Sequence, residues 1–210
     1  MKSYRLNIEV IIASVGVFSL LMFSTVFVIF NITDIHEISK ILIEYAYIIA
    51  PTSLLWLLVD KYLWRTKFFQ MIKKSANIPP DLRGRWEGIL ENEDGSATQK
   101  FAIEIKQTLT QMHVFSYPSL GHSVSILPEI ATLENEETFT LCYLWQGETN
   151  TSIKNAHHRE HFQGYTMLDL YEHENPRVLR GIYFTDHIPQ QTRGGIELQW
   201  VSKTLKRKLE

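Results

Sequence analysis

The 210 residues suffice for one domain with additional segments, and the formal net charge of -2 argues against a general nucleic-acid-binding protein. The charge is divided unevenly. Residues 1–78 carry eight Lys or Arg and five Asp or Glu, whereas residues 79–210 carry thirteen and eighteen, giving +3 and -5. The single cysteine, Cys142, excludes an intramolecular disulfide and agrees with a reducing compartment.

Two long apolar segments lie in the first part of the chain. Residues 10–30 form a run of 21 residues without a charge, which matches the roughly 20 residues that a helix needs to cross a bilayer. A second segment, 41–64, is apolar except for Glu44 and Asp60 and contains Pro51. We therefore expect a two-helix transmembrane region over residues 1–66, with N-terminal transmembrane α-helices over about 8–30 and 41–64 and a kink at the proline.

A cleaved signal peptide is the alternative for the first segment. Its apolar run exceeds a usual signal core, however, and no small-x-small cleavage site follows it. Basic residues flank the segments asymmetrically and predict that both termini are cytoplasmic. They are Lys2 and Arg5 before the first segment, Lys61, Arg65, Lys67, Lys73 and Lys74 after the second, and only Lys40 between them.

From Arg83 onward, apolar and polar residues alternate, with turn residues at intervals of roughly ten. Inward positions such as Ile103 and Leu198 should alternate with water-facing ones such as Glu104 and Glu197. The sequence predicts an all-β, eight-stranded antiparallel up-and-down barrel (lipocalin-like) over 81–205, after a basic linker, 67–80, and before a basic tail or expression-vector remnant, 206–210. The predicted strands are 84–91, 99–107, 111–117, 123–133, 137–147, 161–172, 177–185 and 195–203.

The predicted joins alternate in length, which distinguishes the two ends of the barrel. The second, fourth and sixth joins are short, whereas the others include loops such as 148–160 and 186–194. In an up-and-down barrel these two sets lie at opposite ends. Because Pro79-Pro80 leads from the second apolar segment into the first strand, we expect the short-turn end to face the membrane and a loop-rich mouth to face the cytosol.

Gly84-x-Trp86 at the start of the first predicted strand resembles the lipocalin signature, in which the Trp closes the bottom of the barrel. An eight-stranded barrel can be filled by side chains or can hold one small ligand near its mouth. We interpret Trp86 as a plug of the barrel floor rather than as a ligand contact.

Catalytic motifs are missing from the sequence, which has no phosphate loop, nucleophile elbow or dinucleotide glycine pattern, and we expect no enzyme. His157, His158 and His161 have the spacing of metal ligands. They fall in or beside a predicted polar loop without a Cys or carboxylate partner nearby, so a solvated loop is the preferred interpretation. We expect neither a metal nor a cofactor.

Aromatic and arginine side chains, Tyr165 and Phe184 among them, gather near the predicted mouth. Aromatic faces stack nucleobases and guanidinium groups pair with phosphate, although aromatic residues also fill ordinary barrels. Arg180 alternates with Val178 and Ile182, so we expect it on the inner face, where it needs an anion or a carboxylate partner. Gly194 and Gly195 could bring backbone N–H groups close to a phosphate. The candidate ligand-binding residues are Arg180, Arg193, Tyr117, Tyr143, Trp145 and Tyr183.

The whole arrangement is a short basic N-terminus, two apolar segments, a basic linker and then LRGRWEGIL opening a compact barrel. It resembles the two-transmembrane, β-barrel effectors of CBASS, the bacterial cyclic-oligonucleotide-based antiphage signalling system. The resemblance implies a cytosolic barrel that binds a cyclic dinucleotide made by a partner nucleotidyltransferase. It also implies a homo-oligomer among the lipids of the bacterial inner membrane, which it disrupts, so that the infected cell dies by abortive infection.

Two other functions are compatible with the same pattern. One is a membrane-tethered, lipocalin-like carrier of a small apolar ligand or lipid, and the other is a structural adaptor whose barrel is filled. A carrier needs a cavity lining without charge, so an inward-facing Arg180 would argue against it.

Overall fold

The computed structural model describes residues 2–3, 16–21, 24–25, 38–66, 78–95, 98–119, 121–132, 138–149, 161–186 and 191–209. The chain forms two compact units. The barrel unit comprises Met1–Tyr4, Pro80–Gln107 and Gln111–Glu210, and the helical unit comprises Arg5–Pro79 together with Thr108–Thr110.

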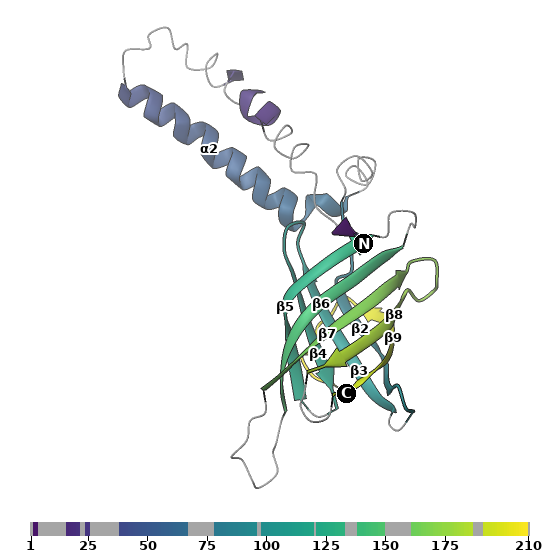
Figure 1. The fold of residues 1–210 in the computed structure, drawn as a ribbon. Coiled ribbons are helices and arrows are strands. Elements are labelled where there is room, and N and C mark those ends of the chain that lie inside the picture. The colour runs from purple at the N-terminus through teal and green to yellow at the C-terminus, as the bar shows by residue number, and fades with distance from the viewer. Residues whose placement is uncertain are drawn as a thin grey trace. The chain divides into compact units, whose positions relative to one another are not determined.

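Eight antiparallel strands close into a barrel (Figure 1). Each strand from β2 to β8 pairs with the next one along the chain, and β9 pairs with β2 to complete the closure. This confirms the predicted up-and-down barrel, and each strand begins and ends within two residues of its predicted bounds. The strands are β2 (Gly84–Asn92), β3 (Thr98–Gln107), β4 (Met112–Pro118), β5 (Gly121–Thr132), β6 (Phe139–Thr149), β7 (His161–Tyr171), β8 (Val178–Thr185) and β9 (Arg193–Ser202).

A short strand that the sequence did not predict, β1 (Lys2–Ser3), adds to the barrel. Its backbone pairs antiparallel with the end of β5, with Lys2 opposite Thr132 and Ser3 opposite Ala131. The first residues of the chain therefore belong to the barrel unit.

The core fills the inside of the barrel, because alternate residues of every strand point inward. Ile103, Val114, Leu168, Leu179 and Leu198 are at most 1% exposed and belong to one apolar cluster. Burial of this apolar surface is the main favourable term in folding.

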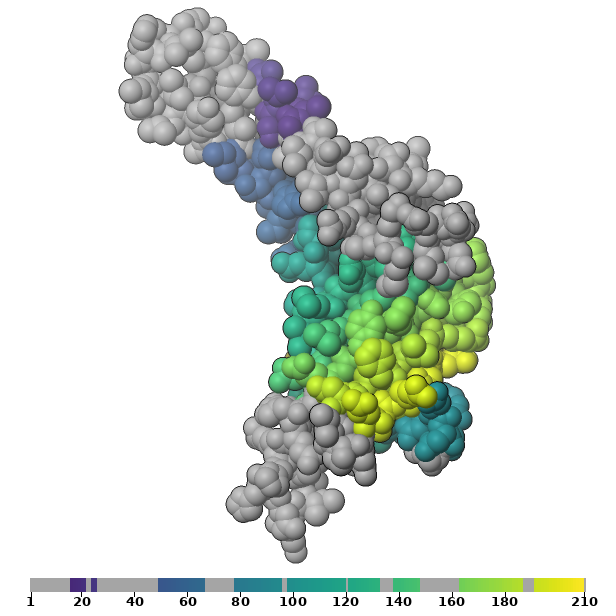
Figure 2. Space-filling model, in the orientation of Figure 1, coloured from purple at the N-terminus to yellow at the C-terminus, as the bar shows by residue number. Residues whose placement is uncertain are grey.

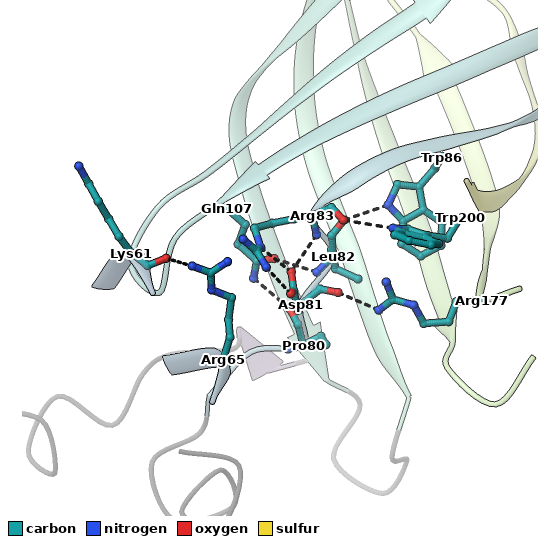
Figure 3. Close-up of polar contacts among 10 residues, drawn as sticks. All are labelled: Lys61, Arg65, Pro80, Asp81, Leu82, Arg83, Trp86, Gln107, Arg177 and Trp200. Carbon is teal, nitrogen blue, oxygen red and sulfur yellow. Dashed lines mark hydrogen bonds and ion pairs between the residues drawn. The ribbon is translucent and has the colours of Figure 1, made fainter. Parts of the chain in front are cut away.

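Trp86 closes one end of the barrel, as the Gly-x-Trp pattern predicted (Figure 3). Its side chain is fully buried and its Nε1 donates a hydrogen bond to the carbonyl of Leu82, 2.9 Å away. The guanidinium carbon of Arg177 lies 5.4 Å from the Trp86 ring and 5.6 Å from the Trp200 ring, and its NH1 donates to the carbonyl of Asp81. Cation–π contact and hydrogen bonding together hold this floor in place.

Gln107 at the end of β3 fastens the segment that leads into β2 (Figure 3). Its Oε1 accepts a hydrogen bond from the backbone N–H of Leu82, and its Nε2 donates to the carbonyl of Pro80, each over 2.9 Å. All three residues are buried, so this amide satisfies two backbone groups that water does not reach. The end of the barrel at which β2 begins is therefore sealed.

Glu104 points away from the barrel interior but does not face water, contrary to the prediction. It is 1% exposed, and its carboxylate accepts hydrogen bonds from the backbone N–H groups of Lys206 (2.6 Å) and Arg207 (2.9 Å). Arg85, which is fully buried, donates to the same carboxylate over 2.8 Å. The prediction was wrong because the C-terminal segment folds back over this part of the wall, a long-range contact that strand alternation does not report.

The helical unit contains α2 (Ile38–Lys61), with Pro51 inside it, followed by the short 3-10 helix η1 (Leu63–Arg65). Residues 16–21 and 24–25 are also helical. Across the described residues, none of the helices combines the length and the apolar character required for membrane crossing. Most of the predicted segment 8–30 and most of the linker lie outside the described residues. Residues 41–64 are described, and α2 covers most of them, but their crossing of a membrane is not confirmed, so both predicted transmembrane helices remain predictions.

Candidate ligand site at the barrel mouth

A hollow of about 1110 Å³ opens at the end of the barrel opposite Trp86. It lies where the turn after β2 meets the start of β9, the end of β8 and the start of β7. Figure 2 shows the yellow surface of the C-terminal part of the chain, which includes β9, beside the teal surface of the β2–β3 hairpin. Principal lining residues are Asn92, Glu93, Tyr165, Tyr183, Phe184 and Arg193. Its volume is slightly above that of typical small-molecule sites, which is about 300 to 1,000 Å³.

Two neighbouring aromatic rings, at outward positions of β7 and β8, border the hollow on the outer side of the barrel. Tyr165 on β7 lies directly opposite Phe184 on β8, with ring centroids 5.4 Å apart and planes inclined by 38°. Phe184 is 47% exposed. Burial raises the pKa of Tyr165 to about 12, helped by the neighbouring thiol of Cys142, so its ring stays uncharged at neutral pH. This pair can stack against a planar heterocycle.

The polar groups of the hollow come from the turn after β2 and from the start of β9. Arg193 forms an ion pair with Glu93, and both side chains are mostly exposed, at 72% and 58%. Tyr183 is 6% exposed, and its hydroxyl donates a hydrogen bond to Oδ1 of Asn92 over 2.7 Å. Burial, followed by the nearby charge of Asp94, raises the pKa of Tyr183.

Gly194 and Gly195 serve different purposes in this wall. A Cβ on Gly194 would lie 1.8 Å from the carbonyl oxygen of Glu91, so the close approach of β2 requires glycine there. A Cβ on Gly195 would find its nearest heavy atom, the carbonyl oxygen of Gly181, at 3.9 Å. Gly195 is paired with Glu91 of β2 and with Ile182 of β8, so its N–H is directed along the sheet and not toward the hollow, contrary to the suggestion from the sequence.

Inside the barrel, a group of hydroxyl-bearing side chains replaces apolar ones at inward positions of β4 to β7. Ser116 and Thr166 are 4% and 2% exposed, and Nε1 of Trp145 donates to Oγ1 of Thr166 over 3.0 Å. The Tyr143 hydroxyl points toward Ser116 and Thr166 but makes no hydrogen bond that satisfies the usual geometry, although the side chain is 1% exposed. Burial raises its pKa. A buried polar atom without a partner is uncommon and calls for an explanation.

The structure separates the predicted ligand residues into three places. Tyr183 and Arg193 line the mouth hollow. Tyr143 and Trp145 point into the filled interior. Tyr117 points outward from β4 and lies near Glu104, and burial followed by that carboxylate raises its pKa.

Arg180 lies on the outer wall, so the predicted inward orientation was wrong. It pairs with Glu174 over 2.7 Å and with Glu197 over 3.1 Å, and its side chain is 40% exposed. The inward positions of β8 belong to Leu179 and Tyr183, which are 0% and 6% exposed. The prediction for Arg180 was wrong because β8 has apolar residues on both of its faces. The alternation of apolar and polar residues therefore does not show which face of β8 points inward.

Sequence reasoning missed Asn92 and Glu93, which follow the apolar part of β2 as ordinary turn residues. It also missed the serines at inward positions, Ser116, Ser123 and Ser125. A signal was present, because these small polar residues occupy the parity that apolar side chains take elsewhere in the barrel.

Comparison with known proteins assigns most of the barrel to a known family. Residues 77–200 match the family described as the Cap15 cyclic dinucleotide receptor domain, and this range extends from the segment before β2 almost to the end of β9. The CD-NTase-associated protein 15 of Escherichia albertii is 25% identical to this chain over 158 residues, which cover 73% of this chain and 78% of that protein. Because the family match covers more than half of the 210 residues, the chain belongs to the family of Cap15 cyclic dinucleotide receptor domains.

Proposed function

We propose that this chain is a CBASS effector that binds a cyclic dinucleotide in the mouth hollow of its barrel. The observation that carries the proposal is the family match over residues 77–200, which includes nearly the whole barrel. The hollow supports it, because an exposed aromatic pair and an arginine border it.

These groups suit the chemistry of a cyclic dinucleotide. Its two bases offer flat faces that stack on Tyr165 and Phe184, worth about 1–3 kcal/mol for each stacked base. Its two phosphodiesters carry negative charge, which the Arg193 guanidinium can bind.

The acidic rim of the hollow sets a condition on this binding. Glu93, Asp94 and Asp186 lie on it, and Glu93 already holds Arg193. A phosphate must therefore displace Glu93 from the guanidinium, a modest cost because exposed ion pairs contribute only about 0–1 kcal/mol.

Beyond binding, the proposal extends to the membrane. The apolar segments 8–30 and 41–64 anchor the protein in the bacterial inner membrane, with the barrel in the cytosol. A cognate nucleotidyltransferase supplies the ligand after infection. Ligand ordering of the mouth loops favours contact between barrels, and confinement in the membrane raises their effective concentration. The resulting homo-oligomer disrupts the membrane and kills the infected cell.

A lipid carrier receives less support from the structure. The outward position of Arg180 removes one argument against it, but the barrel interior is occupied by packed side chains such as Trp145, Tyr143 and Phe101. An apolar ligand would need those side chains to leave the core, which costs about 3–5 kcal/mol for a large aromatic group.

The test is a titration of the full-length protein in lipid nanodiscs with a panel of cyclic dinucleotides and fatty acids, followed by tryptophan fluorescence. We expect saturable binding of a cyclic dinucleotide. We also expect Phe184→Ala to weaken it by about 5- to 100-fold, corresponding to one lost stacking contact. Val201→Ala, an exposed apolar truncation on β9, is the matched control and should bind like the wild type. Saturation by fatty acids alone would overturn the proposal.

A further inference from the structure

Among the described strands from β2 to β9, the junction between β4 and β5 has the fewest paired positions. These strands pair at only two positions, Phe115 with Val124 and Ser116 with Ser123. By contrast, β3 and β4 pair at seven positions, and β5 and β6 pair at eleven. On the edge of β5 that faces β4, the only other backbone partner among the described residues is β1, at its far end. We call this junction the β4–β5 seam.

Side chains stand in for backbone pairing along the seam. Ser125 Oγ accepts a hydrogen bond from the backbone N–H of Val114 over 2.9 Å, in place of a carbonyl of β5. In the adjacent β5–β6 ladder the register shifts between Ser125 and Leu127, so β5 is irregular there, and Pro128 has no N–H to donate. The unsatisfied hydroxyl of Tyr143 also points toward Ser116 on this seam. The seam is thus the place where the barrel wall separates at the lowest cost in hydrogen bonds.

The turn that joins β3 to β4, Thr108–Thr110, belongs to the helical unit. The Asp60 carboxylate in the last turn of α2 accepts hydrogen bonds from the backbone N–H of Thr110 over 2.9 Å and from its hydroxyl over 2.8 Å. The carbonyl of Asp60 accepts a third hydrogen bond, from the N–H of Leu109, over 3.0 Å. Hydrogen bonds to a carboxylate are stronger than those between neutral groups, so this attachment is firm.

Apolar packing strengthens the same attachment. Leu109 is 7% exposed and lies in a small cluster with Trp64, which is 2% exposed, and Ile78, which is 5% exposed, with Val59 packed against them. The turn is therefore held to the end of α2 and to η1 by a carboxylate and by a buried leucine.

We propose that β4 transmits a change at the β4–β5 seam to α2 through Asp60 and the Thr108–Thr110 turn. The seven paired positions of β3 and β4 make this hairpin a stiff unit, while the seam leaves its other edge free to shift. A displacement of β4 at the seam then moves the turn, and the turn moves the end of α2. This inference depends on the proposed function only for its trigger, which is the binding of a cyclic dinucleotide.

A reversible lock on the seam tests this link without ligand. Phe115 and Val124 lie directly opposite each other on the outer face, and opposed residues of antiparallel strands are about 4.5–5.5 Å apart at Cα, within the range for a disulfide. In full-length Phe115→Cys/Val124→Cys, hydrogen–deuterium exchange of residues 59–66 and 108–112 is compared before and after reduction. We expect exchange in both segments to be about tenfold slower in the oxidised form.

The control lock joins strands that are already well paired. Ile89→Cys/Lys100→Cys links opposed residues of β2 and β3, and its oxidation should leave exchange in both segments unchanged. Equal exchange in the oxidised and reduced forms of the seam variant would overturn the link, whether or not a cyclic dinucleotide binds.

A second experiment breaks the attachment and uses the ligand. Asp60→Ala and Thr110→Val should bind the cyclic dinucleotide as the wild type does, but the ligand should no longer alter exchange in residues 59–66. Asp60→Asn, which keeps an acceptor oxygen, should restore the response. A full response in both Asp60→Ala and Thr110→Val would overturn the link. If the wild type binds no cyclic dinucleotide, the proposed function fails, and the disulfide experiment still decides the link.

Discussion

The floor of the barrel and the β4–β5 seam differ in how completely their polar groups are paired. At the closed end, Trp86 and Gln107 each have buried hydrogen-bond partners, and Arg177 lies against two indole rings. At the seam, β4 and β5 pair at only two positions, and the Tyr143 hydroxyl, which lacks a partner of good geometry, points toward Ser116. A satisfied network stabilises one conformation, whereas an incompletely satisfied one leaves alternatives close in free energy. We infer that the floor stabilises one conformation of the barrel, whereas the seam can change at a lower cost in hydrogen bonds.

Trp86→Ala should have the largest effect, because it removes the floor of the barrel and leaves a cavity. We expect the free energy of unfolding to fall by about 3–5 kcal/mol, as for other buried aromatic truncations. Chemical denaturation of the full-length protein measures it. Ile89→Ala, on the exposed face of the same strand, should change stability by less than about 1 kcal/mol. Similar losses in the two variants would remove the distinction between the closed end and the rest of the wall.

Glu104→Gln should have the next largest effect. Burial alone would raise the pKa of Glu104, but the N–H groups of Arg207 and Lys206 and the Arg85 guanidinium together lower it. We expect the neutral amide to cost about 2–3 kcal/mol at pH 7, since hydrogen bonds to a charged group are lost.

The loss of stability in Glu104→Gln should depend on pH. Because the folded pKa lies below the unfolded value of about 4.3, the stabilisation is complete above that value and disappears as the pH falls through the folded pKa. The stabilities of wild type and Glu104→Gln should therefore converge in acid. A difference that stays constant from pH 7 to pH 3 would show that the charge of Glu104 does not stabilise the C-terminal segment.

Two tyrosine-to-phenylalanine changes compare a satisfied hydroxyl with an unsatisfied one. Tyr183→Phe removes the hydrogen bond to Asn92 and should cost about 1 kcal/mol of stability. Tyr143→Phe removes a hydroxyl without a good partner and should cost nothing or stabilise the protein slightly. Thermal unfolding of the two variants measures the difference, and a larger loss in Tyr143→Phe would mean that the Tyr143 hydroxyl is bonded in solution.

Glu93→Gln should have the smallest effect of these changes, and it should strengthen ligand binding. The change frees Arg193 and removes a negative charge beside the phosphate. We expect cyclic dinucleotide affinity to rise by up to about fivefold, in line with the strength of an exposed ion pair. Isothermal titration checks this, and a weaker affinity would indicate that Glu93 contacts the ligand itself.

Much of the barrel could be predicted from the sequence, because strand alternation and turn spacing are local signals. The strand bounds, the plug role of Trp86 and the positions of Tyr183 and Arg193 at the mouth follow from them. The side chain of Arg180 could not be placed, since β8 is apolar on both faces. The surroundings of Glu104 could not be predicted either, because its partners are about a hundred residues away in the chain.

The site itself was only partly predictable. Local pattern identified aromatic residues and arginines near the mouth, but it did not show that Glu93 holds Arg193. That contact joins two turns that become neighbours only when β9 closes the barrel on β2.

The most direct test of the central claim compares two arginines by titrating full-length protein with the cyclic dinucleotide that binds the wild type. Arg193→Ala should weaken binding by about 10- to 100-fold, the effect of losing a charged hydrogen bond to phosphate. Arg180→Ala, on the outer wall, should bind like the wild type. Unchanged affinity in Arg193→Ala, or an equal loss in both variants, would contradict a ligand site in the mouth hollow.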